Sequence, residues 1–228
     1  NWTEAEQQFR IALDAAEKQS NERYIRLVTH NLALAPGFRG DFGEALRWFR
    51  RIFRDDQPDK QLPQEAIGHL NVARLHLYRG EFDQTEKHLE RSLELCQLYN
   101  MRALLAEVFE AYANFYREKA DFVHAEEFYE RAANAYEDAG IETATREFDE
   151  ERAVFYILRG DLARARALLE KLIAFRGDAT GAAAVNTARL RLTQVDLAEQ
   201  KFDGLPEALE DLLAIFHARS HYYYEALT

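Results

Sequence analysis

Several side chains of this sequence are of types that carry chemistry, and they recur at helical spacing. Glu107 and Glu110 form one carboxylate pair, and Glu147 and Glu150 repeat that pair 40 residues later. Two carboxylates can act as a general acid and a general base, but this requires differently tuned environments within a closed pocket. Both pairs occupy equivalent positions of a 40-residue sequence repeat, described below, and this repeat predicts that they lie on an open surface. We therefore expect that the chain is not an enzyme.

Metal and phosphate sites are weakly supported by the sequence. His217 and His221 are four residues apart, but no glutamate follows His217 and no third ligand is evident. The segment 177–181 contains two glycines and lacks the Lys-Ser/Thr of a phosphate-binding loop, so it predicts a turn. His69 and His76 occupy positions that neighbouring repeats fill with large residues, which predicts packed core histidines. We expect no cofactor and no metal.

The composition narrows the classes of partner. The 228 residues include 29 Lys and Arg against 40 Asp and Glu, a net charge of −11. This balance opposes binding to nucleic acid, because bound phosphates must be neutralised by clustered cations. No apolar run approaches the length of a membrane span, and the single Cys96 excludes an internal disulfide. These features predict a cytoplasmic protein with no membrane contact.

The sequence repeats itself every 40 residues, which indicates a repeat architecture. A small residue, an acidic residue and a large apolar residue recur in phase at Gly40-Asp41-Phe42, Gly80-Glu81-Phe82, Ala120-Asp121-Phe122 and Gly160-Asp161-Leu162. The same phase includes Asn1-Trp2 and Lys201-Phe202, so six registers of one template cover the chain.

Other columns of the repeat predict two packed helices per unit. One column of small residues follows the turn (Ala5, Ala45, Thr85, Ala125, Ala165), and a larger apolar column lies four residues later (Phe9, Phe49, Leu89, Tyr129, Leu169). Spacings of three and four mark one helix face. A further column precedes the turn by seven residues (Ala33, Ala73, Ala113, Ala153), where small side chains allow two helices to approach closely. Each repeat therefore predicts a helix, a tight turn and an antiparallel second helix.

These columns resemble the tetratricopeptide repeat, in a long form similar to that of MalT-like regulators, peptide-sensing regulators, LGN and kinesin light chain. The resemblance implies an all-α fold: a right-handed α–α superhelical solenoid of antiparallel helix pairs, with about five and a half repeats. We expect a single solenoid over residues 1–228 with turns near residues 40, 80, 120, 160 and 200. Both ends fall within repeats, so we also expect an excerpt of a longer chain.

The resemblance further implies that the first helices line a concave groove. The groove residues expected to bind a partner are Asn31, Asn71, Arg74, Tyr78, Glu107, Glu110, Asn114, Arg117, Glu147 and Glu150. An asparagine amide offers a donor and an acceptor, so Asn31 and Asn71 could hold the backbone of an extended peptide. The groove passes from apolar and amide-bearing residues to acidic ones, which favours a partner with a basic segment.

Three functions remain open at this point. The first is a non-catalytic protein–protein or protein–peptide interaction domain, part of a bacterial regulatory or scaffold protein. The second is a ligand-sensing domain of a regulator, in which His30, Phe38 and Tyr78 would bind a small-molecule inducer. The third is an architectural spacer or self-association module, because apolar repeat ends can pair between copies.

Overall fold

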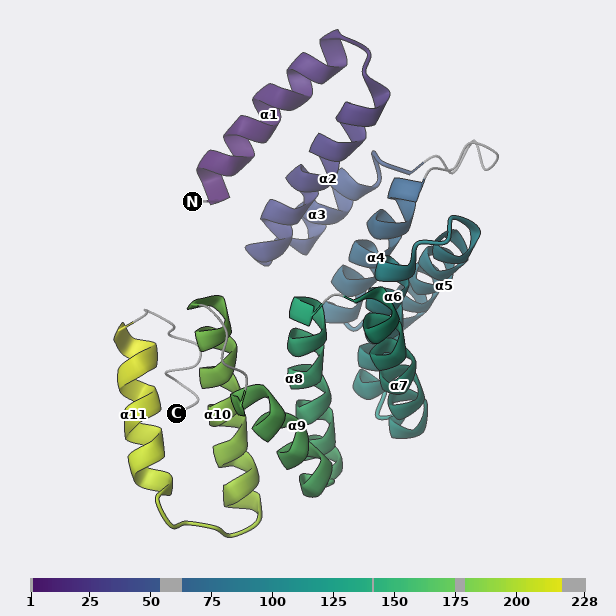
Figure 1. Cartoon of the computed structure of the whole chain (residues 1–228). Coiled ribbons are helices and arrows are strands. Elements are labelled where there is room, and N and C mark those ends of the chain that lie inside the picture. The colour runs from purple at the N-terminus through teal and green to yellow at the C-terminus, as the bar shows by residue number, and fades with distance from the viewer. Residues whose placement is uncertain (1, 54–62, 141, 175–178, 219–228) are drawn as a thin grey trace. The chain divides into compact units, whose positions relative to one another are not determined.

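A computed structural model of the chain describes residues 2–53, 63–140, 142–174 and 179–218 (Figure 1). The regular structure of these residues is helical throughout. The helices are α1 (Trp2–Lys18), α2 (Glu22–Phe38), α3 (Phe42–Phe49), α4 (Pro63–Tyr78), α5 (Phe82–Leu98), α6 (Arg102–Glu118), α7 (Phe122–Ala139), α8 (Glu142–Arg159), α9 (Leu162–Ala174), α10 (Ala179–Ala198) and α11 (Leu205–Ala218).

Helices that follow one another in the chain form antiparallel pairs, as Figure 1 shows clearly for α10 and α11. The expected turns near residues 40, 80, 120, 160 and 200 join α2 to α3, α4 to α5, α6 to α7, α8 to α9 and α10 to α11. Helix α1 precedes these pairs and packs on α2. The predicted all-α repeat of antiparallel helix pairs is therefore confirmed.

Left-handed backbone residues mark many of the helix ends at intervals of 20 or 40 residues. Positive φ angles between 51° and 82° occur at Ser20, Gly40, Gly80, Asn100, Ala120, Gly140, Gly160 and Gln200. At Gly80 this conformation lets the amide of Glu81 donate to the carbonyl of His76 at 2.9 Å, which closes α4. Ala120 adopts the same conformation in the next repeat without the freedom of glycine.

The acidic residue after each turn caps the second helix in three of the four repeats. Asp41, Asp121 and Asp161 each accept a hydrogen bond from the backbone amide three residues later, at 2.9, 3.2 and 3.2 Å. Such a cap satisfies an amide that has no partner within the helix. Glu81 makes no cap bond and instead contacts His76 and Arg79.

The predicted small-residue columns form the helix contacts. Ala33, Ala73, Ala113 and Ala153 of the first helices have 0% exposure. In the second helices, the buried column following the turn is Ala45, Thr85, Ala125 and Ala165, and the larger column is Phe49, Leu89, Tyr129 and Leu169. Since these side chains would leave cavities or clash if changed in size, the 40-residue pattern is the pattern of the core.

The chain divides into two compact units, residues 1–128 and 129–228, with the division inside α7. In the first unit, Tyr112 stacks on Phe128 with ring centroids 4.7 Å apart. In the second unit, Tyr129 packs against Phe155 at 4.8 Å. Each unit thus has aromatic packing of its own.

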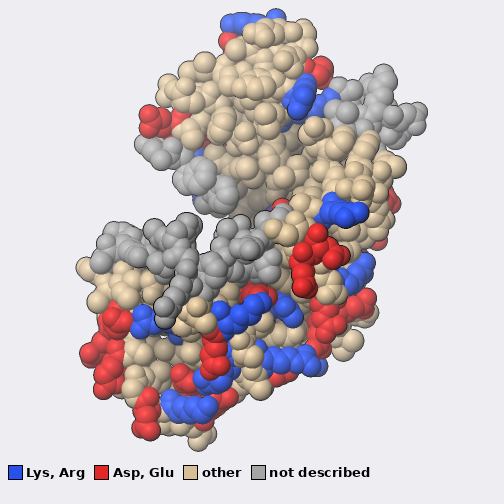
Figure 2. Space-filling view, viewed as in Figure 1, with Lys and Arg blue, Asp and Glu red and all other residues tan. Residues whose placement is uncertain are grey.

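On the face drawn in Figure 2, Lys and Arg lie interspersed with Asp and Glu. None of the helices in the described ranges is both long enough and apolar enough to span a bilayer.

Candidate interaction groove

Helices α2 and α4 enclose a pocket of about 440 Å³ in the first unit. From α4 it is lined by Asn71, Arg74, Leu75 and Tyr78, which are spaced so that they share one helix face. From α2, the turn and α3 it is lined by Ala33, Leu34, Gly37, Gly40, Phe42 and Phe49. Apolar side chains thus form most of the wall, and Asn71 and Arg74 supply the polar groups.

Tyr78 lies at the last turn of α4 and is 74% exposed. Its ring stacks against Phe42, with centroids 5.9 Å apart and planes 17° from parallel. This stacking fixes one face of the tyrosine while the rest of the side chain meets solvent. An exposed aromatic ring on a supported face is typical of an anchor for an apolar side chain of a partner.

Asn71 forms a link between two first helices. Its amide nitrogen donates to Nε2 of His30 on α2 at 2.9 Å, so His30 accepts there as a neutral imidazole. Burial lowers the pKa of His30, and a side-chain hydrogen bond with Asn31 opposes that shift. No hydrogen bond to the Asn71 carbonyl oxygen is present among the described residues, so this oxygen can accept one from a partner.

Two further contacts join successive first helices. In the first unit, Arg74 on α4 pairs with Glu107 on α6 at 3.3 Å, with 33% and 39% of the side chains exposed. In the second unit, the Thr187 hydroxyl on α10 donates to Glu150 on α8 at 2.8 Å. We call the pairs His30–Asn71, Arg74–Glu107 and Thr187–Glu150 the first-helix contacts.

The other expected groove residues have varied surroundings. Asn31, Glu110 and Asn114 are half-buried, and Arg117 pairs with Glu118 at 3.2 Å. The side chains of Phe38 and Glu147 lie outside the described part of the structure, as do His221 and residues 175–178. The structure therefore gathers Asn71, Arg74 and Tyr78 in one pocket and brings Glu107 to Arg74.

Tetratricopeptide-repeat models match residues 64–138 and also residues 27–51 and 148–171, together more than half of the chain. The chain belongs to the tetratricopeptide repeat family. Repeats of this family typically serve as non-catalytic modules for protein–protein interaction. The family assignment identifies neither the surface that is used nor the partner.

Solved structures with similar tetratricopeptide-type folds differ widely in their sources. BtubC (BKLC) from P. vanneervenii has a TM-score of 0.78 at 17% identity, covering 96% of this chain and 92% of that one. A signal transduction ATPase with a tetratricopeptide repeat sensor, from Pyrococcus horikoshii, scores 0.70 at 16% identity, over 100% of this chain and 36% of its own.

A putative kinesin light chain of nearly identical repeats, from Podosopora anserina, scores 0.65 at 17% identity, over 84% of this chain and 94% of its own. At such identities these likenesses concern the tetratricopeptide fold alone. No curated protein sequence matches the chain.

Phe42 and His30 belong to the groove through contacts that the repeat pattern did not identify. Phe42 was expected as a turn residue of the core, yet it also supports Tyr78. The resemblance to tetratricopeptide repeats placed His30 on the inner face, but nothing in the sequence paired it with Asn71, which is 41 positions away. A comparison of polar residues about 40 positions apart on successive first helices could have suggested this pair.

Proposed function

We propose that this chain is a non-catalytic interaction domain that binds an extended peptide or a helix of a protein partner along its first helices. The observation that supports this most strongly is the pocket between α2 and α4, with the exposed, stacked ring of Tyr78 at its edge. An apolar side chain of the partner would fill the pocket and displace water from its walls.

The backbone of the partner would be held beside that side chain. The Asn71 carbonyl oxygen accepts a backbone amide of the partner, while its amide nitrogen stays bonded to His30. Asn31 and Asn114 are side chains of the same type on α2 and α6. These bonds are independent of partner sequence, so the pocket and the charges determine specificity.

The acidic side chains favour a partner with basic residues. Glu107 and Glu110 of α6 act in the first unit, with Arg74 and Arg117 setting the charge pattern around them. Glu147 and Glu150 of α8 give the second unit the same preference. Opposite charges would mainly raise the association rate and fix the direction of the peptide. We place this module in a cytoplasmic regulator or scaffold and treat residues 1–228 as one solenoid.

Selection from a displayed library of linear peptides tests this function. Wild-type protein should enrich clones with an apolar residue followed by Lys or Arg. Tyr78→Glu places a charge at the pocket edge and should fail to retain the same clones, whereas the similarly exposed Val123→Glu on α7 should retain them. Equal retention by both variants, or no enrichment by the wild type, would contradict groove binding.

A second candidate function is the sensing of a small-molecule inducer. The pocket volume of about 440 Å³ lies within the usual range for small ligands, and the structurally similar Pyrococcus horikoshii ATPase has a tetratricopeptide repeat sensor. A metabolite library that raises the melting temperature of the wild type but not of Tyr78→Glu would favour sensing over peptide binding.

A further inference from the structure

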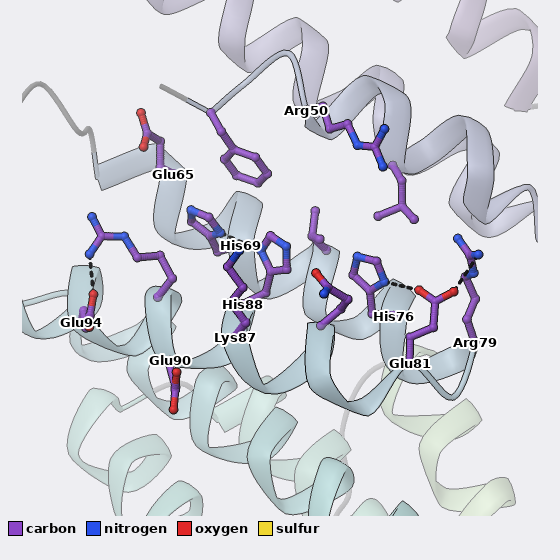
Figure 3. A pocket seen from close by; sticks show the side chains of 15 residues that line it. Arg50, Glu65, His69, His76, Arg79, Glu81, Lys87, His88, Glu90 and Glu94 are labelled. Carbon is purple, nitrogen blue, oxygen red and sulfur yellow. Dashed lines mark hydrogen bonds and ion pairs between the residues drawn. The ribbon is translucent and has the colours of Figure 1, made fainter. Parts of the chain in front are cut away.

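A second cavity, of about 760 Å³, lies on another face of α4 from the groove pocket (Figure 3). Its walls come from α4, from α5 and from the end of α3 with the residues that follow it. Helix α3 ends at Phe49, whereas α5 continues to Leu98, nine residues beyond the matching position Leu89. The α5 residues that line the cavity run from Gln84 to Glu94, so the cavity begins opposite Leu46 of α3 and extends past the end of that helix.

Three histidines form the floor of this cavity. Nδ1 of His69 and Nδ1 of His88 are 2.8 Å apart, so one ring donates and the other accepts. The His88 ring also stacks on His76, with centroids 5.6 Å apart, and Phe53 covers His69 at 4.2 Å. Figure 3 shows the three imidazoles in a row. The second ring nitrogens of His69 and His76 can bond a ligand.

Most of the carboxylates around the cavity are already neutralised. The Glu81 carboxylate contacts His76 at 2.5 Å and Arg79 at 2.7 Å, and the Glu94 carboxylate forms an ion pair with Arg91. In Figure 3 Glu90 points away from the histidines, and its charge acts on Tyr116 of α6.

Glu65, at the far wall, is paired with the buried Arg26 at 3.5 Å. The carboxylates therefore contribute little negative charge to the floor.

Two cationic side chains that line the cavity on different walls are not paired with any carboxylate of the described residues. Arg50, at the end of α3, and Lys87, on α5, form no ion pair within the described residues, yet both line the cavity. Burial, and after it the positive charges of His88, Arg91 and Lys87, lower the pKa of His69 to about 3. An anion in the cavity would relieve this repulsion.

We propose that this cavity binds a small phosphate-bearing molecule, with Arg50 and Lys87 contacting the phosphate and the histidine row bonding its oxygens. A phosphate group suits these side chains because the planar guanidinium of Arg50 can bond two phosphate oxygens while the ammonium of Lys87 bonds a third. The cavity volume accommodates an organic group attached to the phosphate. This site is separate from the groove pocket and does not depend on peptide binding.

Calorimetric titration with inorganic phosphate and with phenyl phosphate, at constant ionic strength, tests the proposal. Both should bind saturably, and Arg50→Ala and Lys87→Ala should each weaken binding about tenfold or more. The matched control Arg102→Ala removes an exposed arginine of α6 outside the cavity and should leave binding unchanged. Tighter binding of phenyl phosphate would assign an organic phosphate; equal affinity would assign the free ion.

A second measurement locates the site on the wild-type protein. In NMR spectra, phosphate should shift the imidazole signals of His69, His76 and His88 and leave that of His217 in place. The proposal is overturned if neither ligand saturates, if Arg102→Ala weakens binding as much as the cavity variants do, or if the three histidine signals stay unmoved. Circular dichroism confirms that each variant remains helical.

Discussion

The amide nitrogen of Asn71 on α4 lies 2.9 Å from Nε2 of His30 on α2, so one hydrogen bond joins the inner faces of two successive repeats. Arg74 and Glu107 continue the connection to α6. These bonds leave the apolar pocket beside Asn71 open. The hydrogen bond and the ion pair therefore fix the walls of this pocket in the free protein, which would lower the entropic cost of binding the proposed peptide.

Asn71→Ala should weaken a selected peptide about 5- to 100-fold, because it removes an acceptor from a buried peptide contact. The control is His30→Leu, which breaks the intramolecular bond and leaves the Asn71 carbonyl in place, so it should lose far less affinity. Calorimetry of the two variants measures this difference. Unchanged affinity in Asn71→Ala would show that the partner backbone is not held there.

Substitutions at two equivalent turn positions, Gly80 and Ala120, should change the stability in opposite directions. Ala120 has φ of 57°, a conformation that disfavours a Cβ, so Ala120→Gly should stabilise the protein by about 1 kcal/mol. Gly80 has φ of 71° with nothing within 4 Å of an added Cβ, so Gly80→Ala should destabilise it by about 1 kcal/mol through backbone strain alone. Urea unfolding of both variants measures the free energies, and changes of the same sign would contradict this account of the turns.

The repeat pattern predicted these turns and the buried alanine columns because both depend on local backbone geometry and on a fixed 40-residue phase. Ala33 and Ala73, for example, were expected at a close contact between helices, and both are fully buried. The pattern did not predict the early end of α3 at Phe49, because the template sequence continues in phase beyond it.

Side-chain partners were harder to predict than the helix pairs. The resemblance to tetratricopeptide repeats placed Asn71 and Tyr78 on an inner face, and in the structure both residues line the pocket between α2 and α4. The bond of Asn71 to His30 and that of His69 to His88 each connect different helices, so they depend on packing distances that a one-dimensional pattern lacks.

Burial of His69 makes the stability depend on pH. Its pKa falls from 6.5 to about 3 on folding, so the unfolded chain binds more protons below pH 6.5. The stability contributed by neutral His69 is complete above pH 6.5 and is lost as the pH falls toward 3, by roughly 1 kcal/mol for each pH unit. Burial of His30 acts in the same direction.

His69→Phe keeps a ring against Phe53 and removes the titrating group. Urea unfolding between pH 7.5 and 5 should show a shallower loss of stability in this variant than in the wild type. The exposed His217→Phe serves as the control and should follow the wild type. If the unfolding free energy of His69→Phe falls with pH as steeply as that of the wild type, His69 is not kept neutral by the fold.

Arg26 on α2 and Glu65 on α4 form an ion pair whose side chains are only 7% and 3% exposed. Glu65→Gln leaves the buried arginine paired with the exposed Glu22 at 3.3 Å and should cost about 2 kcal/mol. The double variant Arg26→Met, Glu65→Leu removes both charges and should recover much of that loss. Urea denaturation measures the free energy of unfolding of the double variant and of Arg26→Met and Glu65→Leu alone. A loss in the double variant equal to the sum of the two single losses would contradict this coupling.

Cys96 on α5 should resist thiol reagents in the folded protein. Its side chain is 1% exposed, and burial raises the pKa of the thiol to about 11. Little thiolate is present at pH 8, and the reagent has no access to it. A chromogenic disulfide reagent should therefore react only after urea is added, and immediate reaction of the native protein would show that the α4–α5 packing opens readily.

Calorimetric titration of a library-selected peptide into the wild type, Tyr78→Ala and Val123→Ala tests the central claim most directly. Tyr78 and Val123 are 74% and 76% exposed, so neither substitution disturbs the core. Groove binding predicts that Tyr78→Ala loses at least tenfold in affinity, about the effect of an aromatic anchor at an interface, while Val123→Ala matches the wild type. Equal affinity of all three proteins would show that the partner binds elsewhere on the chain.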